Sequence, residues 1–239
     1  MPRHVLVTGG ATGIGRACAA RFAKAGDQVW ITGRRAEALE ATAAELGAHA
    51  VVCDGSDPDQ LARLREALPA RIDVLVNNAG GNTDFDGEPG EGLHALAAAW
   101  RANLEANLLT AVLTTAAVRD RLADGGAVVS VGSIAADHGN GSYGPAKAAL
   151  ASWNVGLAGE LGGAGVTANV VSPGYIADTE FFRDKLTDAR RTTLIEATNT
   201  GRAGTPEDIA GTVAYLASPD ARHVTGQVLA VNGGAHPSR

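Results

Sequence analysis

Tyr143 and Lys147 stand four positions apart, a spacing that places both side chains on one face of a helix. Tyrosine has a pKa of about 10 and is a poor acid at neutral pH, but a neighbouring ammonium group stabilises the phenolate and lowers that pKa. Such a pair can give a proton to a developing alkoxide or take one from an alcohol. An exposed contact between successive helical turns is the ordinary alternative. We predict Ser142 as the N-cap of this helix, which puts Pro145 in the first turn, where its missing N–H is not needed.

Further polar side chains follow directly after apolar runs. Ser133 comes after the run 127–131, and its hydroxyl could hydrogen-bond a substrate carbonyl, with a turn serine as the alternative. Asn77-Asn78-Ala79-Gly80 comes after the run 74–76. Side-chain amides beside a glycine suit a backbone that passes close to a ligand, although an ordinary turn has the same composition. If these runs are parallel strands, all of these groups lie at one edge of the sheet.

A glycine-rich turn lies at the start of the chain. The run Thr8-Gly9-Gly10-Ala11-Thr12-Gly13-Ile14-Gly15 follows the apolar residues 4–7 and opens into the helical pattern of residues 16–23. Backbone N–H groups at a helix start carry partial positive charge, and residues without Cβ let a pyrophosphate approach closely. The glycine spacing differs from G-x-G-x-x-G, so a simple glycine-rich turn is the alternative.

These groups need a sheet to hold them, and short apolar runs alternate with helical patterns along the chain. Most runs are continuous in Val, Ile and Leu, as expected for strands covered on both faces. The alternation predicts an α/β fold, with a parallel sheet, right-handed crossovers and helices on both faces. The predicted strands are Val5–Val7, Gln28–Thr32, Ala50–Cys53, Val74–Val76, Ala127–Val131, Thr167–Val171 and Gln227–Val231.

Several helices are marked by their start signals or by their apolar faces. Ala36–Leu46 has an apolar face, Asp57-Pro58-Asp59 precedes a helix over Leu61–Leu68, and Thr205 with Pro206 starts another. Gly92–Leu122 contains no further glycine and no proline, and we predict one long helix with a kink. No linker or repeat divides the chain, so we expect residues 1–239 to form a single domain.

The segment Gly174–Gly204 follows the strand 167–171 and contains no predicted strand. A long excursion at the carboxyl end of a sheet lies where α/β proteins bind their ligands. We expect a lid over the substrate, with Phe181, Phe182, Arg183 and Lys185 as its prominent side chains, and a plain surface excursion is the alternative.

Composition excludes several classes of protein. The net charge of −6 and the pI near 5.5 argue against a nucleic-acid-binding face. No apolar run approaches the roughly 20 residues that span a bilayer, and no targeting signal is evident, so we expect a cytoplasmic location. Cys18 and Cys53 are read as small buried apolar residues. We expect neither a disulfide nor a metal site.

Together these motifs resemble the short-chain dehydrogenase/reductase family, in its compact branch, from the first strand to the last. The run 8–15 is similar to the family's T-G-x-x-x-G-[IL]-G, and residues 77–80 are similar to its N-N-A-G. Tyr143 to Lys147 resembles the Y-x-x-x-K centre, with Ser133 upstream. The other matching motifs are Asn107 with its neighbours, Pro173-Gly174, Gly201 to Asp208, and the ending Thr225-Gly226-Gln227 to Gly233-Gly234.

The resemblance implies a Rossmann-type doubly wound sheet of seven parallel strands with helices on both faces, and a nicotinamide cofactor. It implies that Tyr143 is the acid/base, that Lys147 lowers its pKa and binds the nicotinamide ribose, and that Ser133 holds the carbonyl oxygen. Asn107 would hold a water that relays protons, with Asn103 as its rival. The implied cofactor-binding residues, besides Tyr143 and Lys147, are Gly9, Thr12, Gly13, Ile14, Gly15, Asp54, Asn77, Ala79, Gly80, Pro173, Gly174, Ile176 and Thr179.

The end of the second strand bears on the choice of cofactor. Residues 31–35, Ile-Thr-Gly-Arg-Arg, contain no acid. An acidic residue there would hydrogen-bond the ribose 2′-OH and repel a 2′-phosphate, whereas arginine accommodates that phosphate. Arg34, assisted by Arg35, therefore favours NADP(H) over NAD(H), while two solvated arginines at a helix start are the alternative.

The chain departs from the family pattern in two places. Tyr143 follows Ser133 by ten positions, fewer than is usual in the family, so the loop 134–141 is tight and the substrate mouth is altered. Thr179 stands one residue later than in the common pattern, and we still assign it to the carboxamide of the nicotinamide. His138 in the short loop is a candidate for substrate contact, against the simpler expectation that it is only exposed.

The leading hypothesis is an NADP(H)-dependent carbonyl reductase resembling the 3-oxoacyl-[acyl-carrier-protein] reductases, with a ketone or secondary alcohol as substrate, free or linked to a carrier protein. The alternatives are an NAD(H)-linked alcohol or sugar dehydrogenase and a non-catalytic cofactor-sensing protein. We expect no nucleic acid and no membrane among its partners. The resemblance implies a homotetramer or homodimer assembled through the helices of Gly92–Leu122 and Tyr143–Leu161.

Overall fold

The computed structural model describes residues 2–87, 90–139 and 141–237. Its centre is a seven-stranded sheet in the order β3-β2-β1-β4-β5-β6-β7, in which every neighbouring pair is parallel. The chain winds outward from β1 in one direction and from β4 in the other, so the strand order reverses between these two strands. The strands are β1 (His4–Thr8), β2 (Gln28–Gly33), β3 (His49–Val52), β4 (Ile72–Asn77), β5 (Leu122–Val131), β6 (Thr167–Pro173) and β7 (Val228–Val231).

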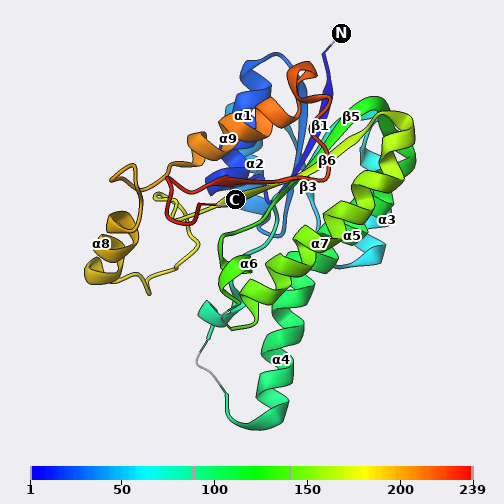
Figure 1. Cartoon of the computed structure of the whole chain (residues 1–239). Helices are drawn as coiled ribbons and strands as arrows, with labels where there is room; N and C mark the ends of the chain where they lie inside the picture. Colours follow the sequence, from blue (N-terminus) through cyan, green and yellow to red (C-terminus); the bar gives the residue numbers. More distant parts are fainter. Residues whose placement is uncertain (1, 88–89, 140, 238–239) are drawn as a thin grey trace.

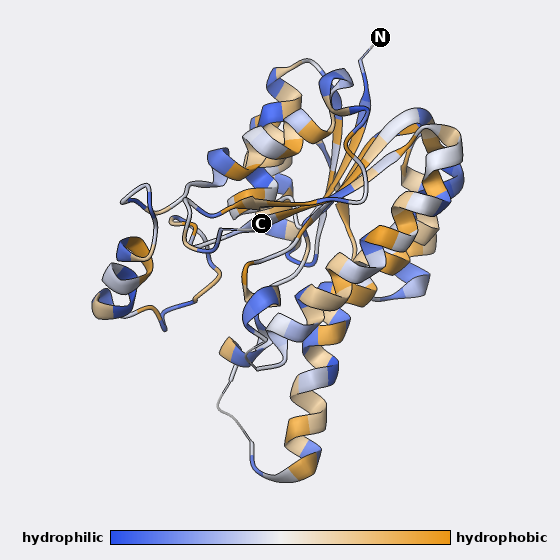
Figure 2. Ribbon diagram, viewed as in Figure 1, coloured by the Kyte–Doolittle hydropathy of each residue, from blue (hydrophilic) through white to orange (hydrophobic). Residues whose placement is uncertain are grey.

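Helices cover both faces of the sheet, as Figure 1 shows. Successive residues of β1 point to opposite sides: Val5 and Val7 pack in one buried cluster and Leu6 in the other. The Val5 side also holds buried residues of α1 (Gly13–Lys24), α2 (Ala36–Leu46) and α9 (Pro206–Leu216). The Leu6 side holds those of α3 (Pro58–Ala67), α5 (Thr110–Val118) and α7 (Tyr143–Leu161). In Figure 2 the strands between these layers are among the most apolar parts of the chain. The doubly wound α/β prediction is confirmed.

Helices alternate with the strands along the chain. They are α1 (Gly13–Lys24), α2 (Ala36–Leu46), α3 (Pro58–Ala67), α4 (Gly92–Leu104), α5 (Thr110–Val118), α6 (Ala135–His138), α7 (Tyr143–Leu161), α8 (Asp188–Glu196) and α9 (Pro206–Leu216). Short turns of helix complete the set: η1 (Thr83–Phe85), η3 (Arg119–Arg121), η4 (Gly162–Ala164) and η5 (Pro219–Ala221).

The predicted long helix over Gly92–Leu122 is interrupted. A π-helical turn, η2 (Glu105–Leu109), separates α4 from α5, and Leu122 is already the first residue of β5. The expected irregularity is therefore a wider turn rather than a sharp kink, and the predicted C-terminal end was wrong. The composition of the segment favours helix throughout, but pairing of Leu122 with Ile72 of β4 draws its end into the sheet.

Three helix starts follow the sequence signals, and two of them have a side-chain cap. Asp57 caps α3, and Thr205 forms a capping box with Asp208 at the start of α9. Ser142 occupies the N-cap position of α7, but its hydroxyl makes no bond to the first turn. It donates instead to Asp84 at 3.0 Å. The predicted N-cap position of Ser142 and the place of Pro145 in the first turn are confirmed.

Cys18 and Cys53 are free and buried, as predicted. Burial raises the pKa of the Cys18 thiol to about 12 and that of the Cys53 thiol to about 11, so both behave as apolar packing groups. Among the helices of the described residues, none combines the length and the apolar character that a membrane crossing requires.

Candidate active site

The glycine turn between β1 and α1 has the geometry of a phosphate cradle. Gly9 and Gly13 adopt positive φ angles of 64° and 53°, which glycine adopts without steric cost. A Cβ on Gly15 would collide with the Gly9 carbonyl oxygen. Thr12 stands at the N-cap position and makes no side-chain bond to the first turn of α1, so the N–H groups of that turn can serve a ligand. These residues therefore fit a dinucleotide pyrophosphate.

Hydrogen bonds join the segment after β4 to this turn. The Asn78 side chain donates to the carbonyl oxygens of Thr8 and Gly9, at 3.0 and 3.1 Å. The Thr8 hydroxyl accepts from the backbone N–H groups of Asn78 and Ala79, both at 3.0 Å. The two strand ends at which the sheet reverses its winding thus form one rigid unit, where α/β proteins bind their ligands.

Not every predicted cofactor residue faces this edge. Asn77 is buried, and its side chain donates to Thr115 of α5 at 2.9 Å. Its Oδ1 is buried and meets no partner among the residues that the structure describes. Ile14 packs against the Val5-side core. A cofactor contact for either side chain stays a prediction, because both have partners within the fold.

The end of β2 carries the two arginines. Arg34 and Arg35 are exposed, beside Asp54 at the end of β3. Partial burial raises the pKa of Asp54, but hydrogen bonds from Ser56 and the charge of Arg34 outweigh it and hold that pKa below its usual value. Asp54 is therefore ionised and free to accept a hydrogen bond. Arg35 pairs with a residue that no sequence signal marks, the carboxylate of Glu180 in the segment 174–204, at 2.7 Å.

Tyr143, Lys147 and Ser133 meet at the carboxyl edge of β5. Tyr143 is the first residue of α7 and Lys147 lies one turn later, with its Nζ 5.8 Å from the Tyr143 ring centroid. Lys147 is buried and donates to the Val131 carbonyl oxygen at 2.8 Å. The Ser133 hydroxyl accepts from the Ala135 N–H at 3.1 Å, so the serine is fixed by its own turn.

The pKa of Tyr143 differs from our prediction. Burial raises it to about 12, and the neighbouring Ser133 hydroxyl only opposes that rise. Burial also lowers the pKa of Lys147 to about 8. The prediction that the ammonium lowers the tyrosine pKa was wrong for this state, because loss of water disfavours both charged forms when the two groups are enclosed together.

Asn107 lies in the π-helical turn, a feature frequent at functional sites. Its side chain accepts from the Gly81 N–H at 3.0 Å and donates to the Gly81 carbonyl at 2.9 Å. A Cβ placed on Gly80 would lie 2.7 Å from the Asn107 Oδ1 and 3.5 Å from the Lys147 Nζ, so these groups converge. Asn103 has a different place: it donates to Asp84 at 2.9 Å and to Ser142 at 2.8 Å, which ties η1 to the start of α7.

After β6 the chain turns onto the site. A Cβ on Gly174 would lie 2.8 Å from the Asn232 Cβ, so only glycine fits after Pro173. Ile176 is buried and bridges to Gly204. The Thr179 hydroxyl donates to the Ile176 carbonyl oxygen at 3.2 Å, and its methyl group would lie 3.5 Å from a Cβ on Gly13. Thr179 therefore lies over the glycine turn.

The segment 174–204, which we predicted to be a lid, brings aromatic rings onto Tyr143. Phe181 packs against the Tyr143 ring with centroids 5.4 Å apart and against Phe182 at 5.0 Å. Phe85 of η1 is 5.9 Å from Phe181, and Tyr175 is 5.9 Å from Phe182. Three of the chain's four phenylalanines thus gather at the mouth of the site. The lid also contains one helix, α8, which Figure 1 shows well outside the sheet.

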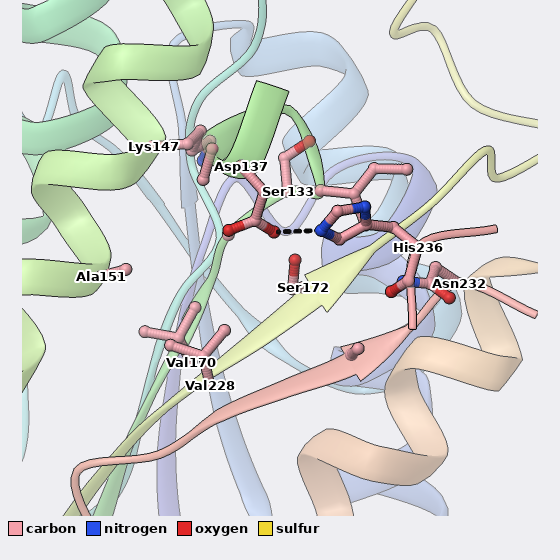
Figure 3. Close-up of a pocket in the computed structure, with 13 residues that line it drawn as sticks. Ser133, Asp137, Lys147, Ala151, Val170, Ser172, Val228, Asn232 and His236 are labelled. Carbon is pink, nitrogen blue, oxygen red and sulfur yellow. Dashed lines mark hydrogen bonds and ion pairs between the residues drawn. The ribbon is translucent and has the colours of Figure 1, made fainter. Parts of the chain in front are cut away.

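The short loop between Ser133 and Tyr143 forms the one-turn helix α6, and Gly139 ends it with a φ of 65°. Position 140 lies outside the described residues. His138 is exposed, as the simpler expectation held, and its ring packs against His236 at 5.0 Å. Figure 3 shows the adjoining pocket, of about 160 Å³, lined by Ser133, Lys147 and residues of β6 and β7, with His236 3.4 Å from Asp137. Its volume is below the roughly 300 Å³ that small-molecule sites begin at, so it is too small for a dinucleotide.

Comparison with known proteins agrees with this geometry. Residues 9–236 match a family model described as Enoyl-(Acyl carrier protein) reductase. The chain is 34% identical over 247 residues to the 3-oxoacyl-[acyl-carrier-protein] reductase FabG of Escherichia coli (strain K12), covering 97% of this chain and 96% of the relative. It is 37% identical over 245 residues to the (2S)-[(R)-hydroxy(phenyl)methyl]succinyl-CoA dehydrogenase subunit BbsD of Thauera aromatica, with the same coverage of 97% and 96%.

A solved structure is similar over nearly the whole chain. It is a blue fluorescent protein from a metagenomic library, in complex with NADPH. The TM-score is 0.87 at 33% identity, and the match covers 98% of each chain. The family that the sequence motifs resembled is therefore confirmed by sequence and by structure.

Proposed function

Because the chain belongs to the short-chain dehydrogenase/reductase family, we propose that it is an NADP(H)-dependent carbonyl reductase of the 3-oxoacyl reductase type. The family is one of oxidoreductases, and the chain is an enzyme that acts on CH–OH or C=O groups with NAD(P). We include in this proposal the preferred cofactor, the substrate and the assembly. We also propose that residues 1–239 form one domain, with residues 174–204 as its lid.

The observation that carries the proposal is the meeting of Tyr143, Lys147 and Ser133 at the sheet edge beside the glycine turn. A nicotinamide bound beside these residues would supply a hydride for the carbonyl carbon. Ser133 holds the carbonyl oxygen by a hydrogen bond, and Tyr143 donates the proton that the oxygen needs as its charge develops. With a pKa of about 12, Tyr143 carries its proton at neutral pH and can act as the acid.

Lys147 and Asn107 support this proton transfer. With a pKa of about 8, Lys147 is mostly protonated at neutral pH, and its charge stabilises the phenolate left after the proton has gone. The convergence of Asn107 and Lys147 on Gly80 supports Asn107, rather than Asn103, as the residue that holds a relay water. In the oxidative direction the same groups take the proton from an alcohol.

The proposed cofactor residues line one path along the sheet edge. Gly9, Gly13 and Gly15 would hold the pyrophosphate, with Thr12 and Ile14 beside it. Asp54 would meet the adenine, and Arg34 with Arg35 would meet the 2′-phosphate. The remaining contacts would come from residues 77–80, Pro173, Gly174, Ile176 and Thr179.

NADP(H) is favoured because the end of β2 presents two guanidinium groups and no acid. The NADPH bound to the similar metagenomic protein supports the same choice. An NAD(H)-linked alcohol or sugar dehydrogenase is the second candidate, and the ratio of kcat/KM for the two cofactors separates the two.

The aromatic rings over Tyr143 favour a substrate with an apolar or aromatic group next to its carbonyl. The phenyl group in the name of the Thauera aromatica relative and the acyl carrier in that of the Escherichia coli relative agree with this class. A thioester-linked ketone is therefore the first substrate to try.

We propose a homotetramer or homodimer that pairs α4, α5 and α7. Leu93, Leu96 and Trp100 of α4 are 81%, 55% and 40% exposed, and their spacing forms an apolar stripe along one face of the helix. A second copy of the chain would cover that stripe. Sedimentation of the wild type and of Leu96→Glu tests this assembly.

The test of the function is NADPH oxidation against a panel of ketones, enoyl thioesters and 3-oxoacyl thioesters. Turnover of ketones or 3-oxoacyl thioesters is the expected result. Tight binding of NADPH without turnover of any member would favour a cofactor-sensing protein. Failure to bind NADPH and NADH alike would overturn the proposal.

A further inference from the structure

The lid places a carboxylate where the proposed cofactor's phosphates would bind. The Arg35 guanidinium donates to the Glu180 carboxylate through two nitrogens, at 2.7 and 3.3 Å. The Thr12 hydroxyl, at the start of α1, donates to the same carboxylate at 3.4 Å. One anion is therefore shared between the end of β2 and the start of α1, the two elements that the proposed function assigns to phosphate binding.

The neighbouring lid residue confirms that this segment lies on the cradle. The Thr179 methyl group stands 3.5 Å from the position of a Cβ on Gly13. Two residues with positive φ, Asp178 at 56° and Arg183 at 53°, bracket the strip Thr179–Phe182. They are the only residues other than glycine with positive φ in the described part of the chain, so the strip is bent down onto the turn at both ends.

We propose that Glu180 is an internal substitute for a cofactor phosphate, which competes with NADP(H) for Arg35 and Thr12 and must be displaced when the dinucleotide binds. This inference rests on the proposed function for the identity of the competing ligand. The end of β2 has no acidic residue of its own, and Glu180 of the lid takes that place. Glu180 is then a determinant of the affinity for the cofactor.

The partners of Glu180 keep its carboxylate ionised. Hydrogen bonds from Arg35 hold the pKa of Glu180 below its usual value, against a partial desolvation that raises it. Arg183 adds to the lowering through its charge, while its own guanidinium is paired with Asp86 at 2.6 Å. Glu180 is therefore an anion at neutral pH, like the phosphate group whose place it takes.

The ion pair between Arg35 and Glu180 is weak enough for a ligand to displace it. The side chains of Arg35 and Glu180 are 59% and 58% exposed, and exposed ion pairs are worth little because water screens them. A dinucleotide brings several phosphate charges to the same donors. Displacement of Glu180 is therefore favourable once the cofactor arrives. The Arg35–Glu180 pair lowers the apparent affinity for the cofactor without abolishing binding.

Displacement has a consequence at the catalytic tyrosine. Phe181 follows Glu180 directly and covers the Tyr143 ring, with centroids 5.4 Å apart. A shift of Glu180 away from Arg35 moves the residue that closes the substrate mouth. The cofactor would then bind first and the substrate second.

The test is the dissociation constant of NADPH and of NADH, measured by fluorescence titration at low ionic strength, for the wild type and Glu180→Gln. Removing the competitor should tighten binding by about two- to fivefold, the factor that an exposed ion pair can supply. The matched control is Glu160→Gln, because Glu160 pairs with Arg119 at 2.6 Å, is 57% exposed and lies away from the glycine turn on α7. The control should leave both constants unchanged.

A double-variant cycle shows whether the effect passes through Arg35. In the background of Arg35→Gln, the Glu180→Gln exchange should tighten binding much less. Tightening for NADPH alone identifies the 2′-phosphate as the group with which Glu180 competes, and equal tightening for NADH identifies the pyrophosphate. Raising the salt concentration should shrink the difference between the wild type and Glu180→Gln.

Unchanged or weaker binding by Glu180→Gln would overturn the inference, since Glu180 would then be neutral or would clasp the bound cofactor. Equal tightening by Glu160→Gln would overturn it as well, because the effect would reflect net charge alone. Failure of the wild type to bind either nucleotide would instead remove the proposed function on which the inference rests.

Discussion

The two sides of the site are held in place by different kinds of contact. On the cofactor side, buried or half-buried groups join Thr8 and Asn78 through hydrogen bonds of about 3 Å between the ends of β1 and β4. On the lid side, exposed ion pairs join Arg35 to Glu180 and Arg183 to Asp86. Buried hydrogen bonds are costly to break, whereas exposed ion pairs contribute little. We therefore expect the proposed cofactor side to behave as a fixed frame and the predicted lid to be the part that ligands displace.

If the frame and the lid differ in this way, changes in the frame should have large effects on catalysis or folding. Changes in the lid, such as Glu180→Gln, should alter affinity by only a few-fold. The following substitutions sharpen or break this contrast, from the largest expected effect to the smallest.

Tyr143→Phe removes the proton donor and leaves the ring that packs under Phe181. We expect kcat to fall by about 10²- to 10⁴-fold, the range that a positioned acid contributes, with little change in the NADPH dissociation constant. Steady-state kinetics and fluorescence titration measure the two quantities. Tyr215→Phe, on an exposed part of α9, is the control and should behave as the wild type. Wild-type turnover by Tyr143→Phe would refute the assigned role.

Gly15→Ala places a Cβ against the Gly9 carbonyl oxygen and forces the cradle apart. We expect NADPH binding to weaken by more than about tenfold and the free energy of unfolding to fall by about 1–3 kcal/mol, as overpacking does. Gly211→Ala on α9 is the control, because a Cβ there meets no atom within 4 Å. That exchange should raise stability by about 0.5–1 kcal/mol. Unchanged binding by Gly15→Ala would show that the cradle yields as easily as the lid.

Lys147 should make stability depend on pH. Burial lowers its pKa from 10.5 to about 8, so between these values the unfolded chain binds more protons than the folded protein. The contribution of Lys147 to the free energy of unfolding must then rise with pH across this window, by about 1.4 kcal/mol for each unit. The cost of burying the charge is fully present below pH 8.

Urea unfolding at pH 8 and pH 9.5 measures this rise. We expect the wild type to gain about 2 kcal/mol more than Lys147→Met over that interval, because methionine has no proton to lose. The high pKa of Tyr143 acts in the opposite sense, but only above about pH 10. Parallel pH profiles for the two proteins would show that Lys147 is not enclosed as described.

Arg34→Asp exchanges the guanidinium at the end of β2 for an acid. We expect kcat/KM for NADPH to fall by about ten- to hundredfold, since a hydrogen bond to a charged group contributes roughly 1.5–3 kcal/mol, and the value for NADH to rise. Arg21→Asp, exposed near the far end of α1, controls for the change in net charge. An unchanged ratio between the cofactors would favour the NAD(H)-linked alternative.

The local part of the site could be predicted from residues 8–15, 133 and 143–147. Glycine spacing, strand ends and the tyrosine–lysine interval follow from short-range geometry, and the structure brings these groups together at one edge. The seven strands were predicted because apolar runs of Val, Ile and Leu mark them, although only the central strands are largely buried and the edge strands β3 and β7 are not. The end of the long helix was missed at Leu122, because pairing with β4 outweighs the local preference.

Some functional contacts have no local signal. Glu180 meets Arg35 from 145 residues away, and nothing in the composition of the lid marks that carboxylate. The nearest signal was the absence of an acid after β2. Ser142 looked like a helix cap, but in the structure its hydroxyl is drawn to Asp84 and Asn103.

The amino-acid sequence by itself determined the family, the parallel sheet and the identity of the Ser133, Tyr143 and Lys147 set, because each depends on residue types at short, fixed spacing. Only the tertiary structure decided how these groups are charged and covered. The pKa of Tyr143 depends on how much water the lid leaves around it, and the state of Arg35 depends on which anion reaches it. Both are properties of distant segments packed together, which no local pattern encodes.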